Sequence, residues 1–129
     1  MEQDLRALLL AGLTGMTADR LNWGEHPQGA AGPYVVLYLV SWNMGHTQQG
    51  PDGLEQARVQ VDCYADTFGA ARGLARQVMG LLDGYRGGQF QAIFSAGMRM
   101  SREADENGGE AIYRASLDFI IHWRNENAG

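Results

Sequence analysis

The chain of 129 residues contains no lysine, one cysteine, three prolines and no long apolar run. All ten basic residues are arginine, and fifteen acidic residues bring the formal net charge to -5. An acidic chain without a basic run is not expected to attract nucleic-acid phosphates, which argues against non-specific binding of DNA or RNA. Arginine keeps its charge and pairs bidentately, so its exclusive use is compatible with protein interfaces.

The cysteine content and the hydrophobic pattern restrict the compartment. The lone Cys63 excludes an intramolecular disulfide and favours a reducing environment. No segment approaches the roughly 20 apolar residues of a membrane-spanning helix, so no membrane partner is expected. The first residues, MEQDLRALLLAGL, are acidic where a secretory signal is basic, which argues against export. With 45% hydrophobic residues, the chain is expected to form one domain over residues 1–129.

Hydrophobic periodicity predicts two helices and at least four strands. Helical spacing covers residues 3–16 and 68–82, with Asp66 or Thr67 as the second N-cap and Asp83 and Gly84 as the stop. The strands are expected at 33–42, 58–64, 90–101 and 111–124, with 21–23 as a candidate additional short strand. Residues 43–55 are expected to form a long flexible loop, and 102–110 the polar tip of a hairpin.

This order predicts an α+β fold. We expect a mostly antiparallel four-stranded sheet with the two helices packed on one face, in the order α-β-β-α-β-β. Two strands are apolar on both faces. In 33–42 the expected faces are Tyr34, Val36, Tyr38, Val40 and Trp42 on one side and Val35, Leu37 and Leu39 on the other. In 90–100 one face is expected to read Phe90, Ala92, Phe94, Ala96, Met98 and Met100. Because two helices cover only one sheet face, we expect a neighbouring subunit to cover the other, in a homo-oligomer.

Cys63 lies where the strand 58–64 approaches the second helix, a place where enzymes often carry catalytic groups. A reactive thiolate needs an exposed, electropositive setting with a base in reach. The strand period instead places Cys63 with Val59 and Val61 on the core face, and Asp62 on the opposite face. We therefore expect a buried, inert cysteine rather than a nucleophile.

Other patterns that carry chemistry are not found in the sequence. His26 and His46 fall in predicted loops and His122 in the last strand, where it shares a face with Ile120 and Arg124, so no metal-ligand spacing results. The acidic residues of segment 102–110 are expected to be a solvated cluster. There is no phosphate loop, nucleophile elbow or basic-aromatic platform. We expect no catalytic residue, metal or cofactor.

The second predicted helix has glycines where solvent is expected. Its apolar face comprises Ala71, Leu74, Ala75, Val78, Leu81 and Leu82, and the opposite face Gly69, Arg72, Gly73, Arg76 and Gly80. Each interior glycine costs roughly 0.5–1 kcal/mol relative to alanine. These glycines are either tolerated, or they allow another backbone to approach while the arginines pair across the contact.

Several segments occur in an order that resembles a known family. They are the helix EQDLRALLLAGL, the strand entry PQG followed by PYVVL, the stretch DGLEQARVQVDCYADTFGAARGLARQV, and a long final strand with aromatics. Together they cover about residues 1–124, and 58–78 is the most specific part. The chain resembles the tail-completion, or tail-terminator, family of long-tailed bacteriophages and phage-like gene transfer agents.

The resemblance implies a small α+β protein that forms a ring, commonly a homohexamer, at the head-proximal end of the tail tube. Such a ring terminates tail polymerisation, offers a head-tail joining surface to the connector proteins of the neck, and lets DNA pass through its bore without specific binding. The implied location is the tail or neck of a virion or phage-like particle, assembled in the bacterial cytoplasm. The family has no catalytic residues.

Two sets of candidate contacts follow from position in the sequence. The candidate subunit interface comprises Gly69, Arg72, Gly73, Arg76, Gly80, Tyr34, Tyr38 and Trp42. The candidate contacts with tube or connector are Met44, His46, Gln48, Gln49 and Asp52 in one segment, and Arg102, Glu103, Asp105 and Glu106 in the other. Two alternatives remain: another neck or head-tail connector component, or a small oligomeric ligand-binding protein or enzyme with a site between subunits.

Overall fold

The structure is a computed structural model that describes residues 1–26, 32–47, 50–103 and 112–124; for 44–47 and 50–53 it describes the backbone only. The elements in chain order are α1 (Glu2–Gly12), the short 3-10 helix η1 (Ala18–Arg20), β1 (Leu21–Trp23), β2 (Tyr34–Thr47), β3 (Gly50–Ala65), α2 (Phe68–Leu82), β4 (Phe90–Glu103) and β5 (Ile112–Arg124).

The five strands form one mixed sheet in the order β1-β2-β3-β5-β4. The pairs β2–β3, β3–β5 and β5–β4 are antiparallel, in agreement with the expected mostly antiparallel sheet, whereas β1 pairs with β2 in parallel. The α+β class is therefore confirmed, and the candidate short strand at 21–23 is the fifth strand, which makes the sheet mixed. Residues 21–23 are too short to show a strand period, and their pairing with β2 is what makes them a strand.

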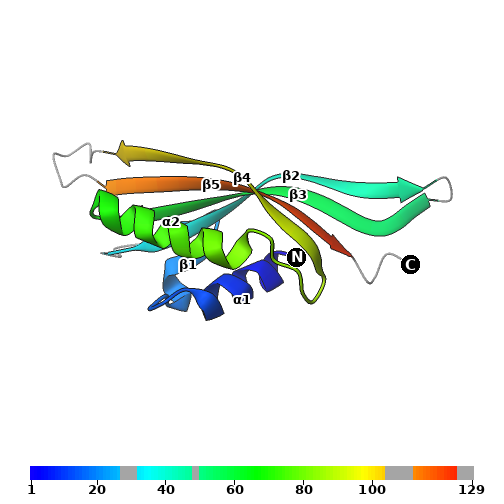
Figure 1. Cartoon of the computed structure of the whole chain (residues 1–129), viewed down its shortest axis with the longest axis horizontal. Helices are drawn as coiled ribbons and strands as arrows, with labels where there is room; N and C mark the ends of the chain where they lie inside the picture. The colour runs from blue at the N-terminus through cyan, green and yellow to red at the C-terminus, as the bar shows by residue number, and fades with distance from the viewer. Residues whose placement is uncertain (27–31, 48–49, 104–111, 125–129) are drawn as a thin grey trace.

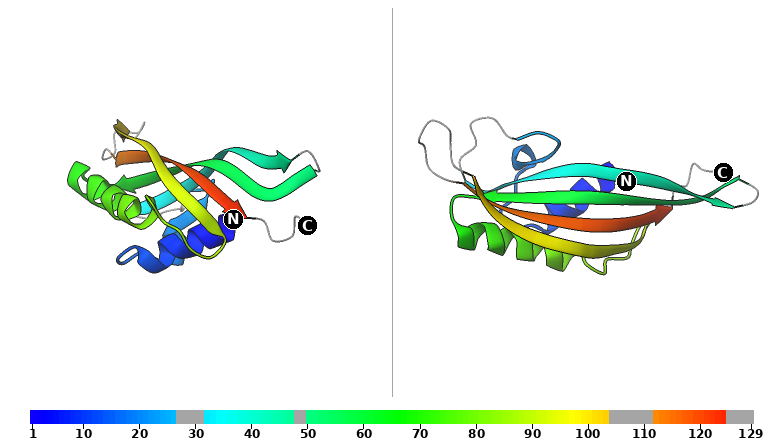
Figure 2. Two further views of the ribbon diagram at one scale, coloured as in Figure 1. Left: turned by 45° about the vertical axis from the view of Figure 1, so that its right-hand side comes forward. Right: turned by 90° about the horizontal axis from the view of Figure 1, so that it is seen from above.

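Both helices lie on one face of the long, twisted sheet, and α2 packs across β3 and β5 (Figures 1 and 2). The helix side holds the main core, in which Leu5, Val61, Val78 and Phe119 are fully buried. We call this side the helix face and the other side the open face. The β2–β3 hairpin extends beyond the helices at one end of the molecule, as Figure 1 shows.

The second helix begins and ends where its capping residues predict. Thr67 Oγ1 accepts a hydrogen bond from the backbone N–H of Ala70 at 3.1 Å, which satisfies one free donor of the first turn. Gly84, two residues after the helix, has φ +81°, a conformation that a residue with a Cβ rarely adopts. The first helix ends at Gly12, earlier than the predicted residue 16, because Leu13 is already extended.

Most of the predicted loop 43–55 is strand. The backbone pairs Met44 with Glu55 and His46 with Pro51, so the hairpin closes near Thr47 and Gly50. The expectation of a long loop, with His46 in it, is therefore wrong. Pro51 lacks a backbone N–H and cannot donate to a neighbouring strand. It lies beyond Leu54, where the pairing of β3 with β5 ends, so β3 needs hydrogen-bond donors on only one side at this position.

Irregular pairing changes the predicted strand faces. In β2 the register shifts between Leu39 and Ser41, so Trp42 pairs with the core residue Ala57. Trp42 therefore lies on the helix face and does not share the open face with Tyr34 and Tyr38. An extra residue in a strand reverses every side chain after it.

The same effect divides the predicted apolar face of β4. Register shifts lie between Phe90 and Ala92 and between Ser95 and Gly97. Consequently Phe90, Met98 and Met100 pair with residues of the helix face, whereas Ala92 and Phe94 pair with open-face residues of β5. The prediction of one continuous apolar face on this strand is wrong.

Candidate assembly surfaces

The outward side of α2 carries the predicted glycines and arginines. Gly69, Arg72, Arg76 and Gly80 are exposed, and Gly73 is half-buried. A Cβ placed on any of the three glycines would meet no atom within 4 Å. Packing within the described chain therefore does not require glycine at these positions, and both interpretations of this surface stay open.

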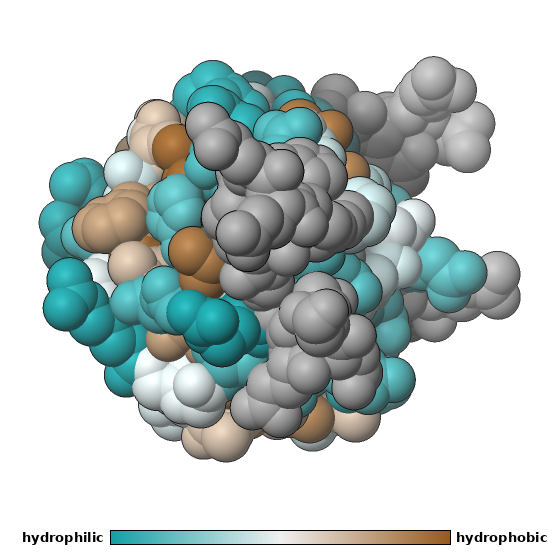
Figure 3. All heavy atoms as spheres, turned by 90° about the vertical axis from the view of Figure 1, so that its right-hand side faces the viewer, coloured by the Kyte–Doolittle hydropathy of each residue, from teal (hydrophilic) through white to brown (hydrophobic). Residues whose placement is uncertain are grey.

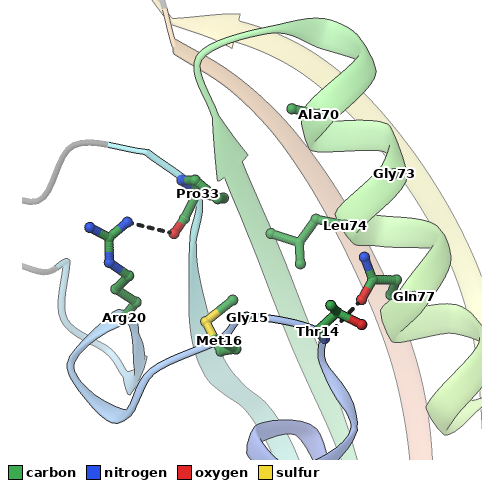
Figure 4. Close-up of a pocket in the computed structure, with 9 residues that line it drawn as sticks. All are labelled: Thr14, Gly15, Met16, Arg20, Pro33, Ala70, Gly73, Leu74 and Gln77. Atoms are coloured by element: carbon green, nitrogen blue, oxygen red, sulfur yellow. Dashed lines mark hydrogen bonds between the residues drawn. The ribbon is translucent and has the colours of Figure 1, made fainter.

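A groove of about 450 Å³ lies beside this surface, between α2 and the segment 14–20 (Figure 4). Gln77 Oε1 of α2 accepts a hydrogen bond from the backbone N–H of Thr14 at 3.1 Å, and Arg20 Nη1 donates to the carbonyl of Pro33 at 3.4 Å. These bonds join the segment to α2 and to the start of β2. The groove is lined by Thr14, Gly15, Met16, Arg20, Pro33, Ala70, Gly73, Leu74 and Gln77.

The groove therefore brings one predicted interface residue, Gly73, together with residues that the sequence did not single out. No motif marks them, because they come from three separate segments, 14–20, Pro33 and α2, that only the fold places side by side (Figure 4).

Tyr34 and Tyr64 form a small cluster on the open face with His26. The two phenol rings stack with centroids 4.7 Å apart, and the His26 ring meets both edge-on. His26 Nδ1 lies 3.1 Å from the Tyr34 hydroxyl. Burial raises the pKa of Tyr34, and it raises that of Tyr64 to about 12. Tyr34 is thus buried within the chain, and of the two predicted tyrosines only the half-buried Tyr38 keeps a substantial exposed surface.

Arginines and carboxylates cross the centre of the open face. Asp118 Oδ2 accepts a hydrogen bond from Arg99 Nη1 at 3.0 Å and lies 3.6 Å from Arg58 Nη2. The Asp118 side chain is 8% exposed, whereas those of Arg58 and Arg99 are 45% and 61% exposed. The carboxylate thus lies beneath its cations, which present guanidinium groups to solvent.

A second charged group repeats this arrangement around Asp62. Gln60 Nε2 donates to both carboxylate oxygens, at 2.9 and 3.1 Å, and Arg114 Nη1 lies 4.0 Å from Oδ2. Arg114 also pairs with Glu103 at 3.0 Å and donates to Ser101 Oγ. A hydrogen bond with Tyr64 is the main cause that raises the Arg114 pKa. The open face is therefore polar and paired within itself along its centre.

Cys63 lies on the helix face, as predicted, and is fully buried. Burial raises the pKa of its thiol, with the neighbouring Asp62 carboxylate as the second cause. A thiol in this setting is a poor source of thiolate, which argues against a nucleophile. Among the described residues, no group of three or more His, Cys, Asp or Glu side chains could hold a metal ion.

Exposed apolar side chains gather on two strands. The large exposed hydrophobic residues are Leu39, Val40 and Trp42 of β2, Phe94 and Met98 of β4, and Phe68 at the start of α2. Trp42 and Leu39 also line a groove of about 510 Å³ on the helix face, with Met1, Glu2, Glu55, Gln89 and Trp123. Viewed from the end where the β2–β3 hairpin projects, hydrophobic residues form separate spots among hydrophilic ones (Figure 3).

The described parts of the two predicted contact segments lie at opposite ends of the sheet. The β2–β3 hairpin projects at one end, and β4 leads into the other end at Arg102 and Glu103, both exposed (Figure 1). The side chains of Met44, His46 and Asp52 lie outside the described residues, as do Gln48, Gln49, Asp105 and Glu106 altogether. The described parts of the two segments are therefore separated along the sheet and do not form one site.

Comparison with known proteins connects these surfaces to a biological setting. The sequence model of the family described as "Tail completion protein gp17" matches residues 3–123. No protein with curated annotation matches the chain. A solved structure described as "Virion of native gene transfer agent (GTA) particle" contains a chain with a TM-score of 0.67 and 16% identity, covering 94% of this chain and 95% of that one. At this identity the likeness concerns the fold. Within the described residues, no helix is long and apolar enough to span a membrane.

Proposed function

The chain belongs to the tail completion protein gp17 family, and on this premise we propose that it forms a ring that caps the head-proximal end of a tail tube. The observation that carries the proposal is the family match over residues 3–123, almost the whole chain. This family comprises structural phage tail proteins and not enzymes. The fold shared with a chain of a gene transfer agent particle supports the same setting.

Termination and joining need two separate contacts, one with the tube and one with the neck. The separation of the two hairpin ends along the sheet supports this division, because one subunit can then contact two partners at once (Figure 1). We propose that Met44, His46, Gln48, Gln49 and Asp52 serve one contact with the tube or connector, and Arg102, Glu103, Asp105 and Glu106 the other. A tube end covered by the ring no longer offers the surface that the next tube ring would need.

The charge of the chain suits a ring around DNA. A subunit with net charge -5 repels phosphates on average, which favours passage of DNA through the bore without specific binding. We place the protein in the tail or neck of a virion or phage-like particle, assembled in the bacterial cytoplasm.

The test is polymerisation of purified tail tube protein with and without this protein, followed by electron microscopy. We expect to see rings either in the sample of purified protein alone or at the ends of tubes in the mixture. In the mixture, the tubes should be shorter, because they stop growing at the capped end. An unrelated acidic protein of similar mass serves as the control for crowding. Tubes that grow to the same length with no added density at their ends would overturn the terminator function.

A second candidate, another head-tail connector component, is favoured by one observation. The chain with the similar fold belongs to the structure of a whole virion, so the shared fold is as compatible with a neck position as with the tail. Binding to isolated head connectors without any binding to tube ends would support that candidate. The exposed Arg102 allows a further check: Arg102→Glu should weaken one of the two interactions, whereas Arg86→Glu, in the exposed connection after α2, should weaken neither.

A further inference from the structure

The groove of about 510 Å³ on the helix face is lined by a buried glutamate whose carboxylate has no partner in the described chain. Among the described residues, the buried acidic residues are Glu55, at 7% exposed, Asp62 and Asp118. Asp62 and Asp118 pair with arginines, whereas no hydrogen bond or ion pair of the described residues reaches the Glu55 carboxylate. Burying a carboxylate costs free energy unless a cation or a donor compensates, so Glu55 indicates a cation that a second molecule supplies.

The Glu55 carboxylate remains accessible from the groove. No side-chain nitrogen or oxygen of the described residues is both sealed from solvent and without a hydrogen-bond partner, so the Glu55 oxygens keep a route to the open space that this residue lines. Met1 also lines the groove, but none of the ion pairs of the described chain joins its amino group to Glu55. An approaching cation can therefore reach the carboxylate through the groove.

Two tryptophans lie on the same face of the sheet as this carboxylate. Trp123 of β5 pairs directly with Glu55, and Trp42 of β2 pairs with Ala57, two residues further along β3. Trp123 is buried, whereas Trp42 is 51% exposed and lines the groove. A guanidinium can pair with a carboxylate while it stacks on an indole ring, so this combination of groups favours an arginine as the cation.

The outward surface of α2 offers two arginines of this kind. Arg72 and Arg76 are exposed, lie one helical turn apart, and make no ion pair or hydrogen bond through their side chains within the described chain. They are the only charged residues of α2, and like charges at this spacing repel each other. Gly69, Gly73 and Gly80 have open space beside them, so a second surface can come close to the arginines.

The groove and the outward surface of α2 cannot meet within one chain. The apolar side of α2 packs on β3 and β5, so its arginines lie on the side away from the sheet, whereas the groove is lined by sheet residues and by the start of α1. The groove also lies toward the β2–β3 hairpin, which extends beyond the helices (Figure 1). A helix of a second copy could therefore continue the helix layer at this end. The two surfaces differ, so the contact is heterologous and can repeat around a ring until it closes.

We propose that neighbouring copies of this protein join by docking Arg72 and Arg76 of one copy on this groove of the next, where Glu55 and the exposed Glu2 pair with them and Trp42 provides the stacking surface. This proposal rests on the ring that we propose as the functional form, and it adds the surfaces that build that ring. It gives the buried Glu55 a partner, and it gives the two arginines the opposite charge that α2 lacks.

Charge reversal on matched arginines provides the first test. We expect the double variant Arg72→Glu with Arg76→Glu to reduce the ring to monomers by light scattering. Arg86, in the connection after α2, is also exposed, so Arg86→Glu is the control and should leave the ring intact. Circular dichroism checks that the variants are folded. A folded double variant that keeps the ring would overturn the proposal.

A charge swap tests whether the acidic side of the contact is the groove. Glu2 is exposed, so Glu2→Arg can be added to the double variant without burying a charge. We expect it to restore part of the ring mass, whereas Glu25→Arg, at another exposed acid, restores none. No restoration by Glu2→Arg, or equal restoration by both, would overturn the pairing of these charges.

Tryptophan fluorescence reports on the groove itself. Trp42 is 51% exposed in the subunit and should become protected from acrylamide quenching when the ring forms. The Trp42→Phe variant should lose this change in quenching, whereas Trp23→Phe, at a half-buried residue, should keep it. A ring in which Trp42 is quenched as readily as in the free subunit would overturn the proposal.

The outcomes separate this inference from the function. Rings that persist in the folded double variant would overturn the arginine contact and leave the ring function intact. Rings in which Trp42 becomes protected only after tube or connector protein is added would assign the groove to that partner and also overturn the contact between copies. A protein that forms no ring and caps no tube would overturn both the contact and the function.

Discussion

The two faces of the sheet alternate along the same strands, but they bury their side chains by different means. On the helix face, Val59, Val61 and Cys63 are fully buried under a helix layer. On the open face, Asp62 is equally inaccessible at 1% exposed, although both helices lie on the other side of the sheet (Figure 2). Gln60 of the same strand and Arg114 of the neighbouring β5 lie against it.

This difference shows that burial on both faces of a strand does not require a second protein layer. Long arginine side chains cover short ones on adjacent strands while their charged ends stay in water. The need for a partner is therefore indicated by the large apolar residues that stay exposed, and all of these except Phe68 lie on the outer long strands β2 and β4.

The largest effect is expected where the helix face loses volume. Phe119 is fully buried, so Phe119→Ala should lower the free energy of unfolding by about 3–5 kcal/mol through lost burial and a cavity. Ile120, the next residue, is half-buried on the open face, and Ile120→Ala should cost about 1 kcal/mol. Urea denaturation measures both losses in the free energy of unfolding, provided that the m-value is the same in the variants and the native protein. Equal losses would show that the two faces are equally packed.

A smaller effect is expected from the charges of the open face. Asp62→Ala removes the acceptor of Gln60 and one partner of Arg114, and should cost about 1–3 kcal/mol because two half-buried donors lose a buried acceptor. Glu103 pairs with the same arginine but is 44% exposed, so Glu103→Ala should cost about 0–1 kcal/mol. If both variants unfold at the same urea concentration, the position of the carboxylate beneath the arginine does not matter.

A third effect on the open face appears only at alkaline pH. The neutral phenol of Tyr64 is favoured in the folded state because burial raises its pKa from 10.0 to about 12. Its contribution to stability is complete below the unfolded pKa and is lost as the pH rises through the folded pKa. Tyr64→Phe should therefore flatten the fall of the unfolding midpoint over this range. Tyrosinate absorbance should show that the variant has one late-titrating phenol fewer than the native protein, in which burial also raises the pKa of Tyr34 and Tyr38.

Sequence periodicity predicted the parts of the fold that repeat regularly. The bounds of α2 and the burial of Cys63 follow from it, and the succession of helices and strands led to the expected mostly antiparallel sheet, although not to the order of its strands. The β-bulges were not predicted, because one extra residue in a strand leaves no periodic signal, and they reversed the predicted face of Trp42. The extension of β2 and β3 through residues 43–55 was not predicted for a related reason. These residues show no alternation of polar and apolar side chains, and they form strands because the two segments pair with each other.

The exposure of the candidate interface residues was predicted correctly only where it depends on a single element. The outward face of α2 follows from the helix period alone, and its glycines and arginines lie where the sequence places them. The ion pairs of Asp62 and Asp118 join residues of different strands, and no single segment of the sequence reveals such a register. The exposed apolar side chains of β2 and β4 likewise depend on strand order, which makes these two the outer long strands.

The smallest effect concerns the outward surface of α2, where the chain has open space around its glycines. A Cβ at Gly73 would meet no atom within 4 Å, so Gly73→Ala should stabilise the isolated subunit by roughly 0.5–1 kcal/mol. Gly80→Ala, at a fully outward position of the same helix, should give a similar gain by urea denaturation.

The larger side chain of Gly73→Leu then distinguishes the two interpretations of this surface. If another backbone approaches the glycines in the ring, leucine should reduce the assembled mass by light scattering while the subunit stays folded. An unchanged ring mass would mean that the glycines are merely tolerated. The outer strands β2 and β4 would then be the better candidate for the subunit contact, because they are where the chain leaves apolar side chains in water.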